Sequence, residues 1–401
     1  MRVAIVAGET SGDMLGAALV RALKVRWPQV EFYGIAGPKM IAEGVRSLYP
    51  MEKLSVRGYV EVLKHLREIL GIRRGLRNTL LAEPPDLFIG VDAPDFNLAL
   101  EARLKSAGIP TVHYVSPSLW AWRPERIHSI GRSVDHMIVL FPFEEALYRE
   151  VGVPATFVGH PLAEAMPLDP EPERLEARTQ LRLGDSAVGV ALLPGSRVSE
   201  LELHADLVIG TARELHAQRP ELRFFVPLAT RETREYFERR LYALEARELP
   251  ITVLFGHARL ALQAADAALV ASGTATLEAA LARCPMVITY RLSRLTYWLM
   301  RRKALVPYAG LPNILAGEFI VPELLQEDAT PGNLAQALGN WLDNKIARAH
   351  LAERFASLHA ALAAGHDERV VEALAPFFTR IANHAPPGAY TSDRLAAVRG
   401  R

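Results

Sequence analysis

Short apolar runs alternate along most of this chain with longer segments that have helical periodicity. In the first half, runs rich in Val, Ile and Phe cover residues 3–7, 32–36, 87–91, 111–115 and 137–141. A second series covers 188–193, 224–228, 252–255, 267–271 and 286–290. Apolar runs of strand length between helical segments are typical of parallel sheets that helices cover on both faces. The pattern predicts an α/β fold with two Rossmann-like, doubly wound domains.

The boundary between the two predicted domains falls near residue 165. Residues 161–172 contain four prolines, which favours a linker over a regular element. We therefore expect one domain over 1–165 and a second over 166–383, the latter ending in helices from residue 333 onward. Residues 384–401, with Pro386-Pro387-Gly388 and scattered charges, predict a disordered tail.

Composition narrows the functional classes. Lys plus Arg total 46 and Asp plus Glu total 45, and the formal net charge of +1 argues against a nucleic-acid binder that relies on bulk positive charge. The single cysteine, Cys284, excludes an internal disulfide and is consistent with a reducing cytoplasm. Since no stretch approaches the roughly 18 apolar residues that span a bilayer, we expect any membrane contact to be peripheral.

Polar residues follow two apolar runs in the first half. Asp92, Asp95 and Asn97 come after run 87–91, and Ser116 and Trp120 come after run 111–115. Because ligands bind at the carboxyl ends of parallel strands, these residues predict an acceptor site with a general base. Asp92 directly follows its strand and is the better base, whereas Asp95 is expected to cap the next helix. The residues alone leave open a Mg²⁺ site on the two carboxylates.

A glycine-rich turn follows the first strand and precedes a helix. Its sequence over 8–13 is not GxGxxG, and its two carboxylates would repel a pyrophosphate. We interpret it as a loop that binds sugar hydroxyls of an acceptor, through Glu9, Ser11 and Gly12. A simple capped turn, with Ser11 or Asp13 as the cap, is the alternative.

Two turns in the second half have the character of phosphate sites. Run 188–193 leads into a turn that contains Ser196 and Arg197. The guanidinium of Arg197 offers paired donors to a phosphate. A salt bridge between Arg197 and Glu200 is the alternative. Run 267–271 leads into small residues that expose a helix N-terminus. Two such turns in one sheet predict a nucleoside diphosphate, with an acidic residue on the ribose. The residues of the second turn are Ser272, Gly273, Thr274, Thr276 and Glu278.

Residues 58–81 have the pattern of an amphipathic helix with interleaved Lys and Arg. Core packing explains its apolar face in the ordinary way, yet the cations resemble those of helices that lie on anionic lipid. A second candidate for membrane contact, 290–303, mixes aromatic residues with cations. The apolar residues of the first helix are Val62, Leu63, Leu66, Ile69 and Leu70.

The chain resembles the lipid-A-disaccharide synthases, a family of GT-B glycosyltransferases. The resemblance covers about residues 2–380, in order, and leaves the tail without a counterpart. It is carried by the motifs AGETSGD at 7–13, AGPKM at 36–40, GYVEVL at 58–63, GVDAPDFN at 90–97, HYVSPSLWAWR at 113–123, FPFE at 141–144, LLPGSR at 192–197, ASGTATLE at 271–278, LPNILAG at 311–317 and VPELLQ at 321–326.

This resemblance implies two domains that face a cleft, and an inverting transfer of 2,3-diacylglucosamine from its UDP derivative to the 6-hydroxyl of 2,3-diacylglucosamine 1-phosphate. The products would be a β-1,6 disaccharide and UDP. Asp92 matches the likely base of the family, Arg197 its contact to UDP, and Asn313 a nucleotide contact. No metal or other cofactor would be required. The helix after GYVEVL would associate with the cytoplasmic face of the inner membrane, and a homodimer is a further expectation.

Two alternatives stay open at this point. One is another enzyme on the same scaffold, such as a UDP-sugar epimerase. The other is a nucleotide-binding peripheral membrane module without catalysis, in which Asp92 would be dispensable. An NAD-dependent oxidoreductase is disfavoured because neither half contains GxGxxG.

Overall fold

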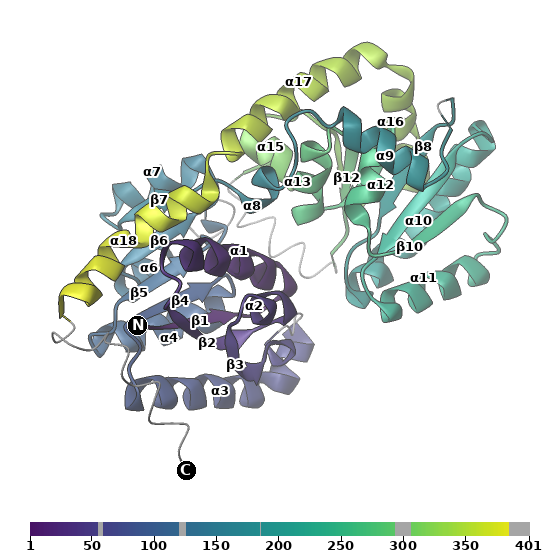
Figure 1. The fold of residues 1–401 in the computed structure, drawn as a ribbon. Coiled ribbons are helices and arrows are strands. Elements are labelled where there is room, and N and C mark those ends of the chain that lie inside the picture. Colours follow the sequence, from purple (N-terminus) through teal and green to yellow (C-terminus); the bar gives the residue numbers. More distant parts are fainter. Residues whose placement is uncertain (55–58, 120–125, 185, 293–305, 385–401) are drawn as a thin grey trace, which may run out of the picture. The chain divides into compact units, whose positions relative to one another are not determined.

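The computed structural model describes residues 1–54, 59–119, 126–184, 186–292 and 306–384 (Figure 1). These residues form two compact units. Unit 1 contains the described part of 1–161 together with residues 365–384, and unit 2 contains the described part of 162–364. Each unit holds one parallel sheet with its own helices, so the predicted α/β fold with two doubly wound Rossmann-like domains is confirmed.

Unit 1 is built on a seven-stranded sheet with the order β3-β2-β1-β4-β5-β6-β7, in which all neighbours pair in parallel. The central strand β4 is fully buried, and β1 is buried except at its first residue, because helices cover both faces of the sheet. Helices α1 and α3 lie on opposite sides (Figure 1). The strands are β1 (Arg2–Ala7), β2 (Glu31–Ala36), β3 (Arg46–Pro50), β4 (Leu87–Val91), β5 (Thr111–Tyr114), β6 (His136–Val139) and β7 (Ala155–Phe157).

The helices of unit 1 include one from the far end of the chain. α18 (His366–His384) packs on α1 (Thr10–Arg26), where Trp27 and Phe378 stack with ring centroids 4.0 Å apart. The sequence grouped this helix with the second domain; the structure places it in the first, because its apolar stripe completes the core over α1. The other helices are α2 (Pro38–Ala42), the short η1 (Met51–Lys53), α3 (Tyr59–Ala82), α4 (Pro94–Ser106), α6 (Ile127–Ser133) and α7 (Pro142–Glu150).

Unit 2 is built on a six-stranded parallel sheet with the order β10-β9-β8-β11-β12-β13. Its strands are β8 (Gly189–Leu193), β9 (Arg223–Leu228), β10 (Ile251–Phe255), β11 (Ala267–Ala271), β12 (Met286–Tyr290) and β13 (Glu323–Leu325). Its helices are α9 (Glu171–Gln180), α10 (Val198–Gln218), α11 (Arg231–Ala243), α12 (Ala258–Ala264), α13 (Thr274–Leu281), α15 (Leu311–Ala316), α16 (Pro331–Asp343) and α17 (Lys345–Leu362). The short α8 (Pro161–Glu164) lies where the chain passes from one unit to the other.

All ten predicted strands are present, within two residues at either end. The sequence missed β3, β7 and β13, which are short and only partly buried, so they carry no continuous apolar run. The predicted tail at 385–401 and most of the candidate membrane segment 290–303 lie outside the described residues.

Candidate functional site

Each sheet has a point at which the strand order reverses, and the sequence-predicted loops lie there. In unit 1 the reversal is between β1 and β4, which pair directly with Ala7 opposite Val91. In unit 2 it is between β8 and β11, with Leu193 opposite Val270. Connections leave such a switch point in opposite directions and open a crevice at the carboxyl ends of the strands. In each unit, the loops that the sequence predicts to bind ligands therefore lie at the switch point of the sheet.

Asp92 stands at the switch point of unit 1 in an unusual backbone conformation. It and Ala93 have φ angles of 51° and 44°, so two consecutive residues other than glycine are left-handed. The amide of Asp92 donates to the carbonyl of Tyr114 at 2.9 Å, which ties the turn to β5. Residues of this kind cost roughly 1–3 kcal/mol each and gather at functional sites. The half-buried Asp92 is thus held at the sheet edge by a strained turn.

The side chain of Asn97 stabilises this turn through hydrogen bonds to its main chain. It is fully buried in α4, and its Nδ2 donates to the carbonyls of Asp92 at 2.8 Å and of Val6 at 3.2 Å, with a longer contact to Val91 at 3.4 Å. Its Oδ1 has no hydrogen-bond partner among the described residues. The Nδ2 group of Asn97 thus positions the main chain of Asp92, and a contact of Asn97 with an acceptor stays a prediction.

The glycine-rich turn lies directly against the Asp92 turn. A Cβ on Gly8 would lie 2.7 Å from the Cβ of Ala93, and a Cβ on Gly12 would lie 3.8 Å from that of Asp92. A side chain at position 8 would push the two turns apart. Glu9 and Ser11 are half-buried at the first turn of α1. The structure thus brings together the predicted acceptor loop and the predicted base.

Asp13 has a role that the sequence missed. The N-cap position of α1 is occupied by Glu9, so neither Ser11 nor Asp13 caps that helix. The buried Asp13 carboxylate instead accepts from the amides of Lys39 and Met40 at 2.9 Å each, which caps α2. A Cβ on Gly37 would lie 2.5 Å from the Asp13 carboxyl carbon. The only signal in the sequence was the Gly-Pro pair that begins α2.

Asp95 is not a helix cap. The N-cap of α4 is Ala93, and Asp95 lies in the first turn with 89% of its side chain exposed. Its carboxylate forms an ion pair with Arg126 at 2.9 Å. Within the described ranges, no group of three or more His, Cys, Asp or Glu is gathered as metal ligands would be. That the reaction needs no metal stays a prediction.

The other predicted acceptor residues follow β5. Ser116 is half-buried, and its hydroxyl lies 2.8 Å from that of Tyr148. The preceding Val115 has a φ of 83°, which a β-branched residue rarely adopts, so a second strained turn lies beside that of Asp92. Trp120 lies outside the described residues.

In unit 2, the turn after β8 forms the N-terminus of the 21-residue helix α10, with Arg197 at the N-cap. The carboxylate of Glu200 accepts from the amides of Ser196 at 2.7 Å and Arg197 at 3.3 Å, and the Arg197 guanidinium donates to its other oxygen at 3.0 Å. The salt bridge that was the alternative is therefore formed. With 37% of the Arg197 side chain exposed, such a pair contributes only about 0–1 kcal/mol. A phosphate can replace Glu200 as its partner.

In the second turn of unit 2, two hydroxyl groups form hydrogen bonds within the unit. Ser272 donates to the carbonyl of Ala309 at 2.7 Å. Thr276 is buried, donates to the carbonyl of Gly273 at 2.8 Å and accepts from the amide of Leu311 at 3.3 Å. The hydroxyl of Thr276 therefore holds the turn together, and its contact with a nucleotide stays a prediction. Gly273 and Thr274 are exposed at the start of α13, and Glu278 is half-buried.

Asn313 is also an internal residue. It is fully buried; its Nδ2 donates to the carbonyl of Val321 at 2.9 Å and to Glu323 at 2.8 Å, and its Oδ1 accepts from the amides of Ile320 and Val321. An amide has two donors and two acceptor sites, so none remains for a nucleotide. The predicted nucleotide contact is corrected. Asn313 and Glu323 instead shape the loop that Ser272 binds.

His204 joins α10 to the residue that follows β12, a contact that was not predicted from the sequence. It is buried in α10; its Nδ1 donates to the carbonyl of Glu200 at 2.7 Å, and its Nε2 accepts from the amide of Arg291 at 3.0 Å. Burial lowers the pKa of His204, which favours this neutral form. No sequence spacing marks such a contact, because Arg291 lies 87 positions away.

A buried histidine also anchors α18 behind the unit 1 site. His366 is 2.7 Å from the hydroxyl of Tyr114, the residue whose carbonyl accepts from Asp92. Burial and the neighbouring His366 lower the pKa of His160 to about 3. His113 is hydrogen-bonded to buried Glu101 at 2.7 Å, and burial raises the pKa of Glu101.

The apolar face predicted for the basic helix divides in α3. Leu66 and Leu70 are each 38% exposed, whereas Ile69 packs against the core. The side chains of Val62 and Leu63 lie outside the described residues. Within the described part of the chain, no helix is both long enough and apolar enough to span a membrane.

Comparison with known proteins agrees with this arrangement. The family model described as lipid-A-disaccharide synthetase matches residues 3–374. A lipid-A-disaccharide synthase of Methylobacillus flagellatus is 54% identical over 375 residues, which cover 94% of this chain and 99% of that protein. One of Chromobacterium violaceum is 57% identical over 362 residues, 90% of this chain and 93% of that protein.

Solved structures with far lower identity share the fold. A UDP-GlcNAc 2-epimerase from Neisseria meningitidis bound to UDP-GlcNAc matches with a TM-score of 0.63 at 13% identity, covering 94% of this chain and 100% of that one. MurG of Acinetobacter baumannii matches with a TM-score of 0.57 at 18% identity, covering 94% and 99%. At such identities the likeness concerns the fold alone. The family match spans nearly the whole described structure, and the chain belongs to the lipid-A-disaccharide synthetase family.

Proposed function

We propose that the chain transfers 2,3-diacylglucosamine from its UDP derivative to the 6-hydroxyl of 2,3-diacylglucosamine 1-phosphate. The products are the β-1,6-linked disaccharide 1-phosphate and UDP. The observation that carries the proposal is the strained turn that holds Asp92 at the switch point of unit 1, in a chain that belongs to this family. Relatives that are 50–57% identical bear the name of this activity.

Asp92 is the general base in this proposal. As the 6-hydroxyl oxygen of the acceptor attacks the anomeric carbon of the donor, its proton passes to the Asp92 carboxylate. The bond between the anomeric carbon and the UDP oxygen breaks with its electron pair on UDP, and the configuration inverts. A base must lie within hydrogen-bond reach of the proton that it takes, so its placement decides the rate. The links from Asn97 and Tyr114 to the main chain of Asp92 support that role.

Unit 2 is the nucleotide side. Negative charge grows on the departing diphosphate. Exposed donors in the turns that follow β8 and β11 are the Arg197 guanidinium and the first turn of α13 at Gly273 and Thr274. Both the guanidinium and the partial positive charge of a helix N-terminus stabilise a phosphate. We propose that they do so without a metal, and that Glu278 receives the ribose hydroxyls.

A peripheral contact with the membrane completes the proposal. Leu66 and Leu70 are one helical turn apart and exposed, and Arg67 and Arg74 are exposed on the same helix. Exposed leucines with cations are suited to the surface of an anionic bilayer, where an acylated acceptor would be held. A membrane-binding surface is consistent with acylated substrates, which are held in a bilayer.

The epimerase alternative rests on fold likeness at 13% identity, whereas the transferase is named by close relatives. Mass spectrometry of the products separates them. Purified protein with the UDP-diacylglucosamine and the diacylglucosamine 1-phosphate should yield the disaccharide 1-phosphate and one UDP per disaccharide. An isomerised UDP-sugar formed without acceptor would instead support the epimerase, and no product with either substrate would support a binding module.

A further inference from the structure

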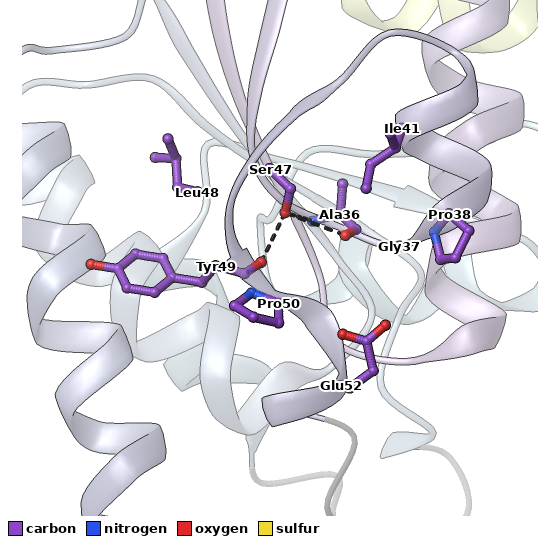
Figure 2. A pocket seen from close by; sticks show the side chains of 9 residues that line it. All are labelled: Ala36, Gly37, Pro38, Ile41, Ser47, Leu48, Tyr49, Pro50 and Glu52. Atoms are coloured by element: carbon purple, nitrogen blue, oxygen red, sulfur yellow. Dashed lines mark hydrogen bonds between the residues drawn. The ribbon is translucent and has the colours of Figure 1, made fainter.

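Unit 1 contains a cavity of about 280 Å³ whose lining residues have no role in the proposed reaction. It lies at the carboxyl ends of β2 and β3, where the end of β2 meets α2 and the end of β3 meets η1 (Figure 2). The sheet edge is the one that carries the Asp92 turn. Its apolar wall is formed by Pro38, Ile41, Leu48 and Pro50.

The polar atoms of this wall are largely occupied. The hydroxyl of Ser47 accepts from the amide of Ala36 at 3.1 Å and lies 2.8 Å from the carbonyl of Tyr49, both of which also line the cavity (Figure 2). The charged group in the lining is Glu52, which is exposed. A carboxylate repels a phosphate, so the cavity is suited to an apolar group of a ligand and not to its phosphate.

The cavity lies beside the glycine-rich turn that packs against Asp92. Gly37 lines the cavity and packs against Asp13, which belongs to the glycine-rich turn. Leu54, just past η1, lies near Gly8 on the other side of that turn. Since β2 and β3 are the second and third strands from β4 and strands are about 4.8 Å apart, the cavity lies roughly 10–14 Å from Asp92. A sugar ring together with the first atoms of an attached acyl chain spans that distance.

We infer that this cavity binds the first part of one acyl chain of the acceptor. The inference rests on the function proposed above, and it names the part of the acceptor that this site selects. With the 6-hydroxyl at Asp92 and the ring over the Gly8–Gly12 turn, an acyl chain on the far side of the ring reaches β2 and β3. Ile41 is 49% exposed, so a chain that covers it removes apolar surface from water. The rest of the chain extends toward the lipid surface.

The test replaces Ile41 by tryptophan, which fills the cavity from an exposed position. Two acceptors with the same sugar 1-phosphate are compared, one with long acyl chains and one with acetyl groups. Loss of two buried methylenes, at about 0.8 kcal/mol each, should raise the KM for the long-chain acceptor about tenfold. The kcat, and both constants for the acetylated acceptor, should stay unchanged. Val25→Trp, at an 83% exposed site on α1, is the matched control.

A second measurement does not depend on turnover. A long-chain acceptor with a diazirine near the carbonyl end of its acyl chain should label residues 36–52 of the wild type, and I41W should suppress the label. Equal KM changes for both acceptors, unchanged KM for both, or labelling only outside 36–52 would overturn the inference while the wild type still transfers. If the wild type formed no disaccharide, the proposed function itself would fail.

Discussion

Replacing Asn97 by alanine separates the positioning of Asp92 from the stability of the fold. The variant loses two hydrogen bonds to main-chain carbonyls, at 2.8 and 3.2 Å, each worth about 1 kcal/mol. It also removes a buried Oδ1 without a described partner, which costs about 1–3 kcal/mol in the native protein. These terms nearly cancel, so we expect unfolding free energy to change by about 1 kcal/mol and the melting temperature by about 3 °C.

Catalysis should change far more. Without the Asn97 bond, the left-handed turn at Asp92 and Ala93 can relax, and a displacement of about 1 Å lowers a rate by about 100-fold. We expect kcat, measured as UDP release, to fall about 100-fold with the KM for the UDP-sugar unchanged. Asn78→Ala on the exposed face of α3 is the matched control. A kcat within threefold of wild type would refute the reasoning. A raised KM for the acceptor at unchanged kcat would instead support the acceptor contact of Asn97 predicted from the sequence.

Two further predictions concern pH and the membrane. The pKa of His160 is about 3 in the folded protein and about 6.5 in the unfolded chain. As the pH falls, the unfolded chain therefore binds a proton at His160 before the folded protein does. The contribution of His160 to stability is present above pH 6.5 and is lost as the pH falls toward 3. At pH 5 the loss is about 2 kcal/mol, and urea melts of His160→Gln should show a pH 7 to pH 5 difference smaller by that amount; an equal difference would contradict this. Replacing Leu66 and Leu70 with serine should weaken binding to anionic vesicles about tenfold, because burying the exposed part of each leucine in the bilayer contributes roughly 0.6–1 kcal/mol. The control Val25→Ser should leave vesicle binding unchanged. Unchanged vesicle binding would contradict a membrane contact at Leu66 and Leu70. Loss of the cooperative melt would show that these leucines belong to the core.

The strands and their functional ends could be predicted because local pattern and topology agree. Fully buried central strands such as β4 and β11 read as apolar runs, and parallel strands bring their carboxyl ends to one edge. The Asp92 turn and the Arg197 turn were therefore found from the sequence. Edge strands such as β3 were missed because half-exposed residues carry a weaker pattern.

Individual side-chain roles were harder, because they depend on partners that are distant in sequence. Asn97 binds the carbonyl of Val6, 91 positions away, and Tyr114 contacts His366, 252 positions away. Asn313 has the composition of a ligand contact but finds all its partners between 320 and 323. Asp95 was expected to cap α4 from its type and spacing, yet the left-handed Ala93 moves the start of the helix so that Asp95 meets Arg126 instead.

The central claim is that Asp92 is the base of a sugar transfer, and comparison of Asp92→Asn with Asp95→Asn tests it most directly. Both changes remove one carboxylate from the same turn, and Asp95 is exposed in a surface ion pair. With disaccharide formation followed by mass spectrometry, D92N should lower kcat by about 100-fold or more while UDP-sugar binding is unchanged, and D95N should stay within about threefold of wild type. Wild-type turnover in D92N, or the larger loss in D95N, would contradict the account.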